Sequence, residues 1–205
     1  MKHQLTVLLL TLIALLAPTS AKAQSWYPPG SYCTAYGGID DFSTWPGTWS
    51  SWVNGTGHVS IGTHLSAYSP PAAASLLMNP TDPVGSFVLI DKAFDATAQY
   101  TYFGEDICGG HFVEPNPNYG PATWGSVIAY VKPQLIGVQS GSLVVMSSSY
   151  TYLSVTPFTL PKNGPWTYVQ SPWISGLPKD IIVRIAIDGK RDAMLVDDVW
   201  TLWFY

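Results

Sequence analysis

The sequence predicts an all-β protein, and three observations support that prediction. Charged residues make up only 11% of the 205 residues, whereas aromatic residues reach 14%. Glycine and proline are frequent, with 18 and 17 residues, so turns recur along the chain. After residue 23 no stretch keeps a helical period over several turns, whereas short alternating and β-branched runs recur. This pattern is typical of an antiparallel β-sandwich with long loops.

The expected strands follow one another from residue 57 to the C-terminus. They lie at 57–65, 84–94, 98–106, 125–138, 141–155, 166–174, 180–189 and 193–205. The alanine-rich segment 69–80 is bounded by prolines, so we expect one helical turn that leads into a strand. The last two strands flank the turn sequence IDGKRDA, and we expect them to pair as a hairpin. Strands of this number and spacing indicate a sandwich or a barrel.

Residues 1–23 have the features of a secretory signal peptide. Lys2 precedes an apolar run at 5–17, and the small residues Ala21 and Ala23 precede Gln24. The run is shorter than the roughly 20 residues that span a bilayer. We therefore expect residues 24–205 to form a single β-sandwich domain that is secreted, in an extracellular or periplasmic location. After cleavage no integral membrane association is expected.

The charge balance and the cysteines refine this picture. Without Lys2 and Lys22, 7 basic residues face 13 acidic ones, which gives a net charge of −6. Such a balance argues against nucleic acid as a partner. Cys33 and Cys108 are the two cysteines of the chain. In an exported protein a single pair predicts one disulfide, and the alternative is two free thiols.

Two adjacent aspartates, Asp197 and Asp198, interrupt the apolar run of the last strand. Neighbours on a strand point to opposite faces, so one carboxylate should face the packed side. The even-numbered face is the more apolar, which makes Asp198 the buried acid. A buried carboxylate needs a cation or several donors. Arg184 on the expected partner strand could supply the charge, and so could a calcium ion.

The last forty residues resemble the closing portion of jelly-roll carbohydrate-binding modules of the galactose-binding-like type. That portion, WTYVQSPWISGLPKDIIVRIAIDGKRDAMLVDDVWTLWF, ends in a strand with an Asp-Asp-Val element. The segments GGIDDFSTWPGTWSSW and GTHLSAYSPPAAASLLM are similar to the parts that open such modules. The opening departs from the family, because Ile39-Asp40 stands where Phe-Glu is usual. The resemblance implies a jelly-roll β-sandwich of galactose-binding-like fold.

The resemblance also implies a structural calcium ion between the opening acid and the first aspartate of the final pair. Here that means Asp40 or Asp41 together with Asp197. Because the face argument favours Asp198 instead, all four aspartates are candidate metal ligands. In the alternative interpretation no metal binds, one aspartate forms a salt bridge with Arg184, and the other is solvated.

Aromatic residues in loops are the candidates for ligand binding. Sugars offer flat C–H faces to aromatic rings and hydroxyls to polar groups. Trp45, Trp49, Tyr119 and Trp124 lie beside proline and glycine, so we expect exposed rings there. The rings expected to lie in the core or to cover an edge are those of Trp52, Trp166, Trp200 and Trp203. The favoured function is therefore non-catalytic recognition of a glycan or polysaccharide.

Two other functions stay open. The first is an extracellular structural or adhesive sandwich without a glycan ligand. The second is a jelly-roll glycoside hydrolase or polysaccharide lyase, for which Glu105 and Glu114 are the candidate carboxylate pair. The histidines show no metal-site spacing, and no serine has the strand–elbow–helix context of a nucleophile.

Overall fold

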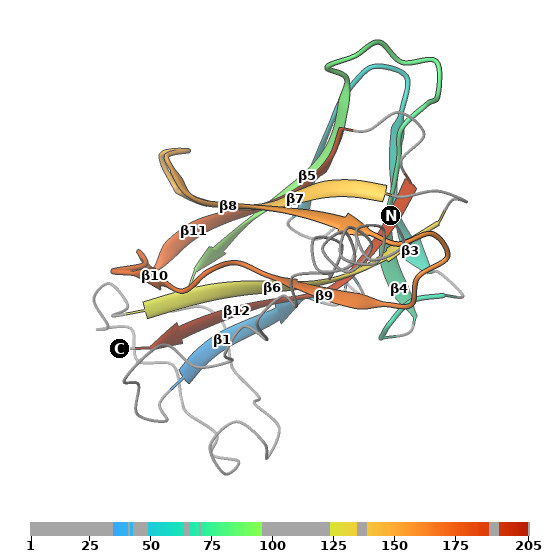
Figure 1. Ribbon diagram of the computed structural model, residues 1–205. Helices are drawn as coiled ribbons and strands as arrows, with labels where there is room; N and C mark the ends of the chain where they lie inside the picture. Colours follow the sequence, from blue (N-terminus) through green and yellow to red (C-terminus); the bar gives the residue numbers. More distant parts are fainter. Residues whose placement is uncertain are drawn as a thin grey trace, which may run out of the picture.

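The computed structural model describes residues 35–40, 42, 49–63, 66–69, 71–95, 124–134, 139–188 and 193–204, of which 35–40, 62–63 and 204 are described by backbone alone. All regular structure in these ranges is β (Figure 1). They contain no helix of the length and apolarity that crossing a membrane requires. The expected signal peptide, the expected strand at 98–106 and both cysteines lie outside the described residues.

Two antiparallel sheets pack face to face, as Figure 1 shows. Sheet A has the order β10 (Ile174–Ser175), β6 (Trp124–Pro133), β12 (Ala193–Phe204), β4 (Ala72–Leu77) and β3 (His58–Thr63), with β9 (Thr167–Gln170) paired to β6 and β1 (Ala35–Asp40) to β12. Sheet B has the order β2 (Trp49–Asn54), β5 (Phe87–Asp95), β11 (Asp180–Ile187), β7 (Gln139–Ser147) and β8 (Tyr152–Leu160). The expected antiparallel jelly-roll sandwich is confirmed.

The core lies between the two sheets and follows from strand alternation. Every second residue of the long strands points inward, and both sheets contribute apolar side chains. The largest fully buried side chains of this core include Trp203, Phe94, Leu76, Met78, Ile90 and Leu143. The two inner faces therefore join into one continuous apolar layer.

Three local expectations were wrong. The last two strands do not pair with each other, because β11 lies between β5 and β7 in sheet B whereas β12 lies in sheet A. Residues 72–77 form strand β4, not a helical turn, because pairing with β3 and β12 outweighs alanine's helix propensity. Residues 141–155 form a β7–β8 hairpin and not one strand.

A β-bulge in β12 places both aspartates in unusual positions. Asp197 lies opposite Tyr130 of β6, but Trp200 lies opposite Ile128, so β12 holds one extra residue there. Asp198 takes a left-handed backbone, with φ of 41°. The inward-pointing residues consequently change from even to odd numbers, since Val196 before the bulge and Val199 after it both belong to the core. Both aspartates are buried, with 0% and 5% of their surface exposed, so neither is solvated.

Candidate functional site

A hollow of about 380 Å³ lies on the outer face of sheet B, the face turned away from sheet A. Its lining residues come from three neighbouring strands and the β7–β8 turn: Trp52, Phe87, Leu89, Asp91, Tyr150 and Arg184. Strand alternation explains why these side chains point outward. Ile90 and Ile185 belong to the core, so their neighbours Asp91 and Arg184 face the opposite side.

An ion pair forms the floor of this hollow. Asp91 and Arg184 lie directly opposite each other in the β5–β11 pairing. Arg184 Nη2 donates to Asp91 Oδ2 at 2.8 Å, and the side chains are 22% and 10% exposed. A salt bridge between Arg184 and an aspartate of β12 was one of the two alternatives for the aspartate pair, and that alternative was wrong. It failed because β11 and β12 belong to different sheets.

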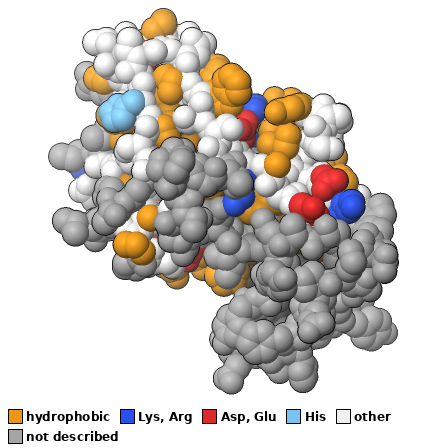
Figure 2. Space-filling model, turned by 180° about the vertical axis from the view of Figure 1, so that it is seen from behind, with side chains coloured by type: hydrophobic (Ala, Val, Ile, Leu, Met, Phe, Trp, Pro, Cys, Tyr) orange, Lys and Arg blue, Asp and Glu red, His pale blue; other side chains and the backbone are white. Residues whose placement is uncertain are grey.

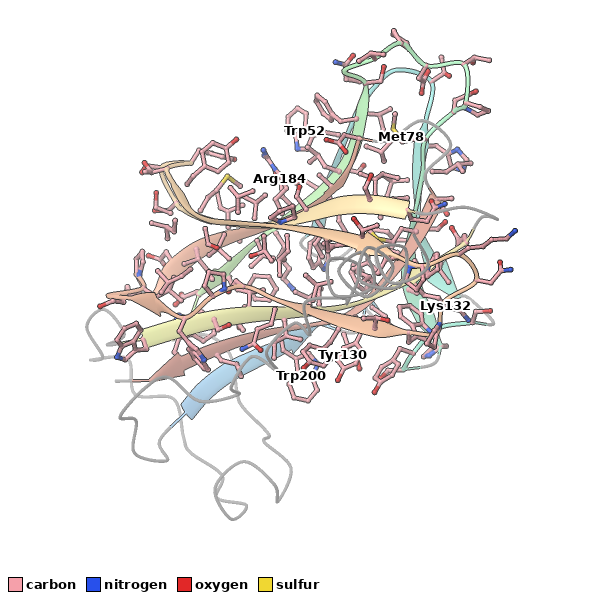
Figure 3. All side chains as sticks on the ribbon, viewed as in Figure 1. Trp52, Met78, Tyr130, Lys132, Arg184 and Trp200 are labelled. Atoms are coloured by element: carbon pink, nitrogen blue, oxygen red, sulfur yellow. The ribbon has the colours of Figure 1, made fainter. Side chains whose placement is uncertain are left out.

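Two exposed aromatic rings line the same hollow. Trp52, on edge strand β2, is 59% exposed, and Tyr150, in the β7–β8 turn, is 61% exposed. In Figure 3, Trp52 and Arg184 both project from sheet B on the side away from sheet A. Figure 2 shows hydrophobic side chains gathered in the upper part of the visible face, with a basic and an acidic side chain between them. The hollow thus combines aromatic faces with charged polar groups.

The four predicted binding aromatics have different fates. Trp49 is not exposed: it is 6% exposed, stacks on Phe42 with ring centroids 5.0 Å apart, and meets Phe94 edge to face. Trp124 opens β6 opposite Ser175 and is half-buried. Trp45 and Tyr119 lie outside the described residues, as do Glu105 and Glu114. Neither Trp49 nor Trp124 lines the hollow.

Sequence reasoning missed both exposed aromatics that line the hollow, Trp52 and Tyr150. Trp52 was expected to lie in the core or to cover an edge, and Tyr150 was placed inside a continuous strand. One signal could have helped with the first. Trp49 and Trp52 are three residues apart on one strand, so they must point to opposite faces. For Tyr150 the available signal is the run of three serines that precedes it, which favours a turn.

The two aspartates of β12 lie at a fork in sheet A. One edge of β12 pairs with β4 up to Val196 and with β1 from Val199 onward. At the gap, Asp197 Oδ2 accepts the backbone N–H groups of Tyr68 and Ser69 at 2.7 and 2.9 Å. Its Oδ1 accepts the N–H of Asp198 at 2.8 Å. The carboxylate thus takes the place of a missing strand partner.

Burial sets the electrostatics of this fork. Desolvation raises the pKa of Asp197 to about 6, and the nearby charge of Asp198 adds to the rise, although the three N–H donors oppose it. Asp198 Oδ2 accepts the Ser69 hydroxyl at 2.6 Å. The described residues contain no group of three or more His, Cys, Asp or Glu side chains that could hold a metal. The side chain of Asp40 and the whole of Asp41 lie outside the described part of the chain.

The fork also positions a second group of aromatic rings, on the outer face of sheet A. Tyr68 stacks on Tyr130 with ring centroids 4.1 Å apart, and Trp166 meets Tyr68 edge to face at 5.9 Å. Trp166 Nε1 donates to Ser66 O at 3.0 Å, which ties the ring to the same loop. Burial, followed by a hydrogen bond with Tyr68, raises the pKa of Tyr130 to about 12. Figure 3 shows Tyr130 and Trp200 on the side of the molecule opposite Trp52.

Comparison with known proteins places the fold. No protein-family profile and no curated protein sequence matches the chain. The K1 cleaved adhesin domain of Lys-gingipain from Porphyromonas gingivalis W83 has a TM-score of 0.51 at 10% identity, covering 80% of this chain and 96% of that one. The module TmCBM61, solved in complex with β-1,4-galactotriose, has a TM-score of 0.46 at 13% identity, covering 78% of this chain and 90% of that one.

Other neighbours are larger. The enzymatically active domain of tailspike protein 4 from bacteriophage CBA120 has a TM-score of 0.47 at 8% identity, covering 75% of this chain. This chain spans only 19% of that protein. Several further neighbours are carbohydrate-binding modules of families 11 and 22. Of the three neighbours named here, the adhesin domain has a TM-score above 0.5, and at 10% identity its likeness to this chain concerns the fold alone.

Proposed function

We propose that this chain is a secreted, non-catalytic carbohydrate-binding domain that holds a glycan in the hollow of sheet B. One observation carries the proposal: Trp52 and Tyr150 line the hollow together with the ion pair of Asp91 and Arg184. A sugar ring stacks its C–H face on an aromatic ring and directs hydroxyls at polar neighbours. The volume of about 380 Å³ is in the usual range for small-ligand sites.

The ion pair has spare hydrogen-bonding capacity on the side that faces the hollow. Arginine carries five N–H donors, and a carboxylate has about four acceptor positions. Between Arg184 and Asp91 a single hydrogen bond forms. The pair thus offers a donor and an acceptor side by side, which complements two neighbouring hydroxyls of a sugar. It does so without a net charge on the floor of the hollow.

The test is direct binding. The mature chain should bind at least one polysaccharide on a broad glycan array, with an affinity measurable by calorimetry. Trp52→Ala should weaken that binding about tenfold or more, as removal of a central aromatic contact does. Tyr68→Ala, on the opposite face, is the matched control and should leave binding unchanged. An array without any bound glycan would favour the structural or adhesive alternative.

A glycoside hydrolase or lyase is the other alternative, and it would depend on Glu105 and Glu114. We expect no release of reducing sugar from any glycan that the chain binds. Release that disappears in Glu105→Gln would contradict the non-catalytic proposal.

A structural calcium ion beside the β12 fork is part of the proposal. The carboxylate oxygens that the structure describes suit a calcium ion. Asp197 Oδ1 accepts one N–H, whereas a carboxylate oxygen has two acceptor positions, so one position is left for the ion. Asp197 and Asp198, with Asp40 and Asp41, would hold the ion through oxygen atoms and tie β1 to β12. A chelator should then lower the melting temperature, and Asp197→Ala should abolish that sensitivity. A melting temperature indifferent to chelator would exclude the ion.

Export and the disulfide of Cys33 and Cys108 complete the proposal. Expression with the native N-terminus should yield an exported chain that begins at Gln24. Mass analysis with and without reduction, before alkylation, should reveal one disulfide. An uncleaved chain or two alkylated thiols without reduction would contradict these two proposals.

A further inference from the structure

We propose that Tyr150 contacts the bound glycan directly and is held in a strained backbone conformation, so that the position that favours binding also lowers the stability of the fold. The inference rests on the proposed function and adds to it a specific residue and a specific cost. Tyr150 has φ of 62°, lines the hollow of sheet B, and is 61% exposed.

The backbone of Tyr150 is in the left-handed region, which glycine and asparagine adopt far more readily than a bulky aromatic residue. A turn at this position needs only a residue that tolerates a positive φ. The sequence SSSYT supplies a tyrosine instead. Strain of this kind persists only where the surrounding structure fixes the conformation, and it is concentrated at functional sites.

The surrounding turn does fix the conformation. Tyr150 N donates to Ser147 O at 2.9 Å, and Ser147 N donates to Thr151 O at 2.9 Å. Side chains reinforce these bonds, since Thr151 N donates to Ser147 Oγ at 3.2 Å and the Ser147 and Ser149 hydroxyls lie 2.8 Å apart. A bulge between Val145 and Met146 adds local twist to the end of the hairpin.

Packing does not account for the tyrosine. Within the described part of the chain, its ring takes part in no aromatic contact and its hydroxyl in no hydrogen bond. Its exposure of 61% leaves most of the ring in solvent. The ring instead lines the hollow together with Trp52 and the ion pair. A glycan in the hollow would therefore meet aromatic rings contributed by β2 and by the β7–β8 turn.

The experiment compares two tyrosines that differ in backbone conformation. Tyr150→Gly should raise the melting temperature by about 1–4 °C, because glycine relieves the strain, and should weaken glycan binding about tenfold or more. Tyr150→Asn should act in the same direction on both measurements. Tyr152→Gly is the matched control: Tyr152 is 64% exposed, lies on strand β8 without a positive φ and does not line the hollow. It should lower the melting temperature by about 2–4 °C and leave affinity unchanged.

A higher melting temperature together with weaker glycan binding in Tyr150→Gly supports the inference. Replacement of a residue with a purely structural role would lower both the melting temperature and the affinity. A lowered or unchanged melting temperature in Tyr150→Gly would contradict the claim that the backbone of Tyr150 is strained. Wild-type affinity in Tyr150→Gly, with binding still weakened in Trp52→Ala, would contradict a contact between Tyr150 and the glycan and leave the proposed function intact. A wild-type chain that binds no glycan would overturn the proposed function and this inference with it.

Discussion

Arg184 of β11 pairs with Asp91 of β5 in sheet B, while Asp197 lies in sheet A and takes three backbone N–H groups. The chain therefore keeps two separate polar centres, one under each outer face. The centre in sheet B offers its hydrogen-bonding groups to the hollow. The centre in sheet A joins a loop to a fork between strands, so the two should respond differently to mutation.

Removal of one partner of the ion pair should destabilise the protein. Asp91→Ala leaves the partly buried guanidinium of Arg184 without its carboxylate, and we expect a loss of about 1–3 kcal/mol in the free energy of unfolding. Urea denaturation measures it. The double variant Asp91→Leu/Arg184→Met removes both charges and should recover much of this loss of stability, but it should bind glycan more weakly than the wild type because the polar floor of the hollow is gone. A double variant less stable than the single one would contradict the unpaired guanidinium as the cause of the loss.

The two tryptophans of β2 should separate stability from binding. Trp49→Ala empties a core position between Phe42 and Phe94, so we expect a loss of about 3–5 kcal/mol. Trp52→Ala removes a ring that is 59% exposed, so stability should change by about 0.5 kcal/mol or less. Denaturant titration of both variants beside calorimetric binding checks the contrast. Equal losses of stability would contradict the assignment of the two faces.

Loss of the Asp197 carboxylate should open the fork. Asp197→Ala leaves three backbone N–H groups, one buried and two partly buried, without their acceptor, and we expect a loss of about 2–4 kcal/mol. Asp197→Asn keeps one acceptor oxygen and should lose less. Hydrogen exchange at the amides of Tyr68 and Ser69 gives the local readout, which should speed up in both variants. Unchanged exchange at these amides would contradict the hydrogen bonds at the fork.

Much of the fold could be predicted because it follows from local alternation. The segments expected for β3, β5, β6, β11 and β12 form strands, and the sandwich follows from their number and the turn-rich sequence. Partner choice could not be predicted, because hydrogen bonds between strands join residues far apart in the sequence. The expected hairpin between β11 and β12 failed for this reason. A strand pattern alone does not say which sheet the strand joins.

The candidate site was harder to predict, for reasons that particular residues show. Trp49 and Trp52 had to face opposite sides, but local sequence did not say which face was the core. The β7–β8 turn contains no glycine, proline, asparagine or aspartate, and the run Ser147-Ser148-Ser149, a weaker turn signal, was taken as part of a strand. The bulge at Asp198 also lacks a glycine. Because no residue marked the bulge, we expected regular alternation of the two faces along the whole of β12. Strained non-glycine residues hide turns and bulges from pattern reading.

Asp82 should make the protein sensitive to acid. It lies in the connection between β4 and β5 and binds the turn between β2 and β3, the two loops that rise side by side in Figure 1. Thr56 donates its hydroxyl to Asp82 Oδ1 at 2.7 Å and its backbone N–H at 2.8 Å. These hydrogen bonds, with the hydroxyl contributing most, hold the pKa of Asp82 below its ordinary value of 3.8.

A lowered pKa in the folded state means that the unfolded chain takes up its proton first as the pH falls. The stabilisation from Asp82 is therefore complete above pH 3.8 and is lost as the pH drops through the lower, folded-state pKa. Thermal melts of the wild type should show this loss below pH 3.8. Asp82→Asn has no proton to take up and should flatten that part of the curve. Thr56→Val removes the strongest donor and should flatten it partly. Equal acid slopes in all three proteins would contradict the role of this carboxylate.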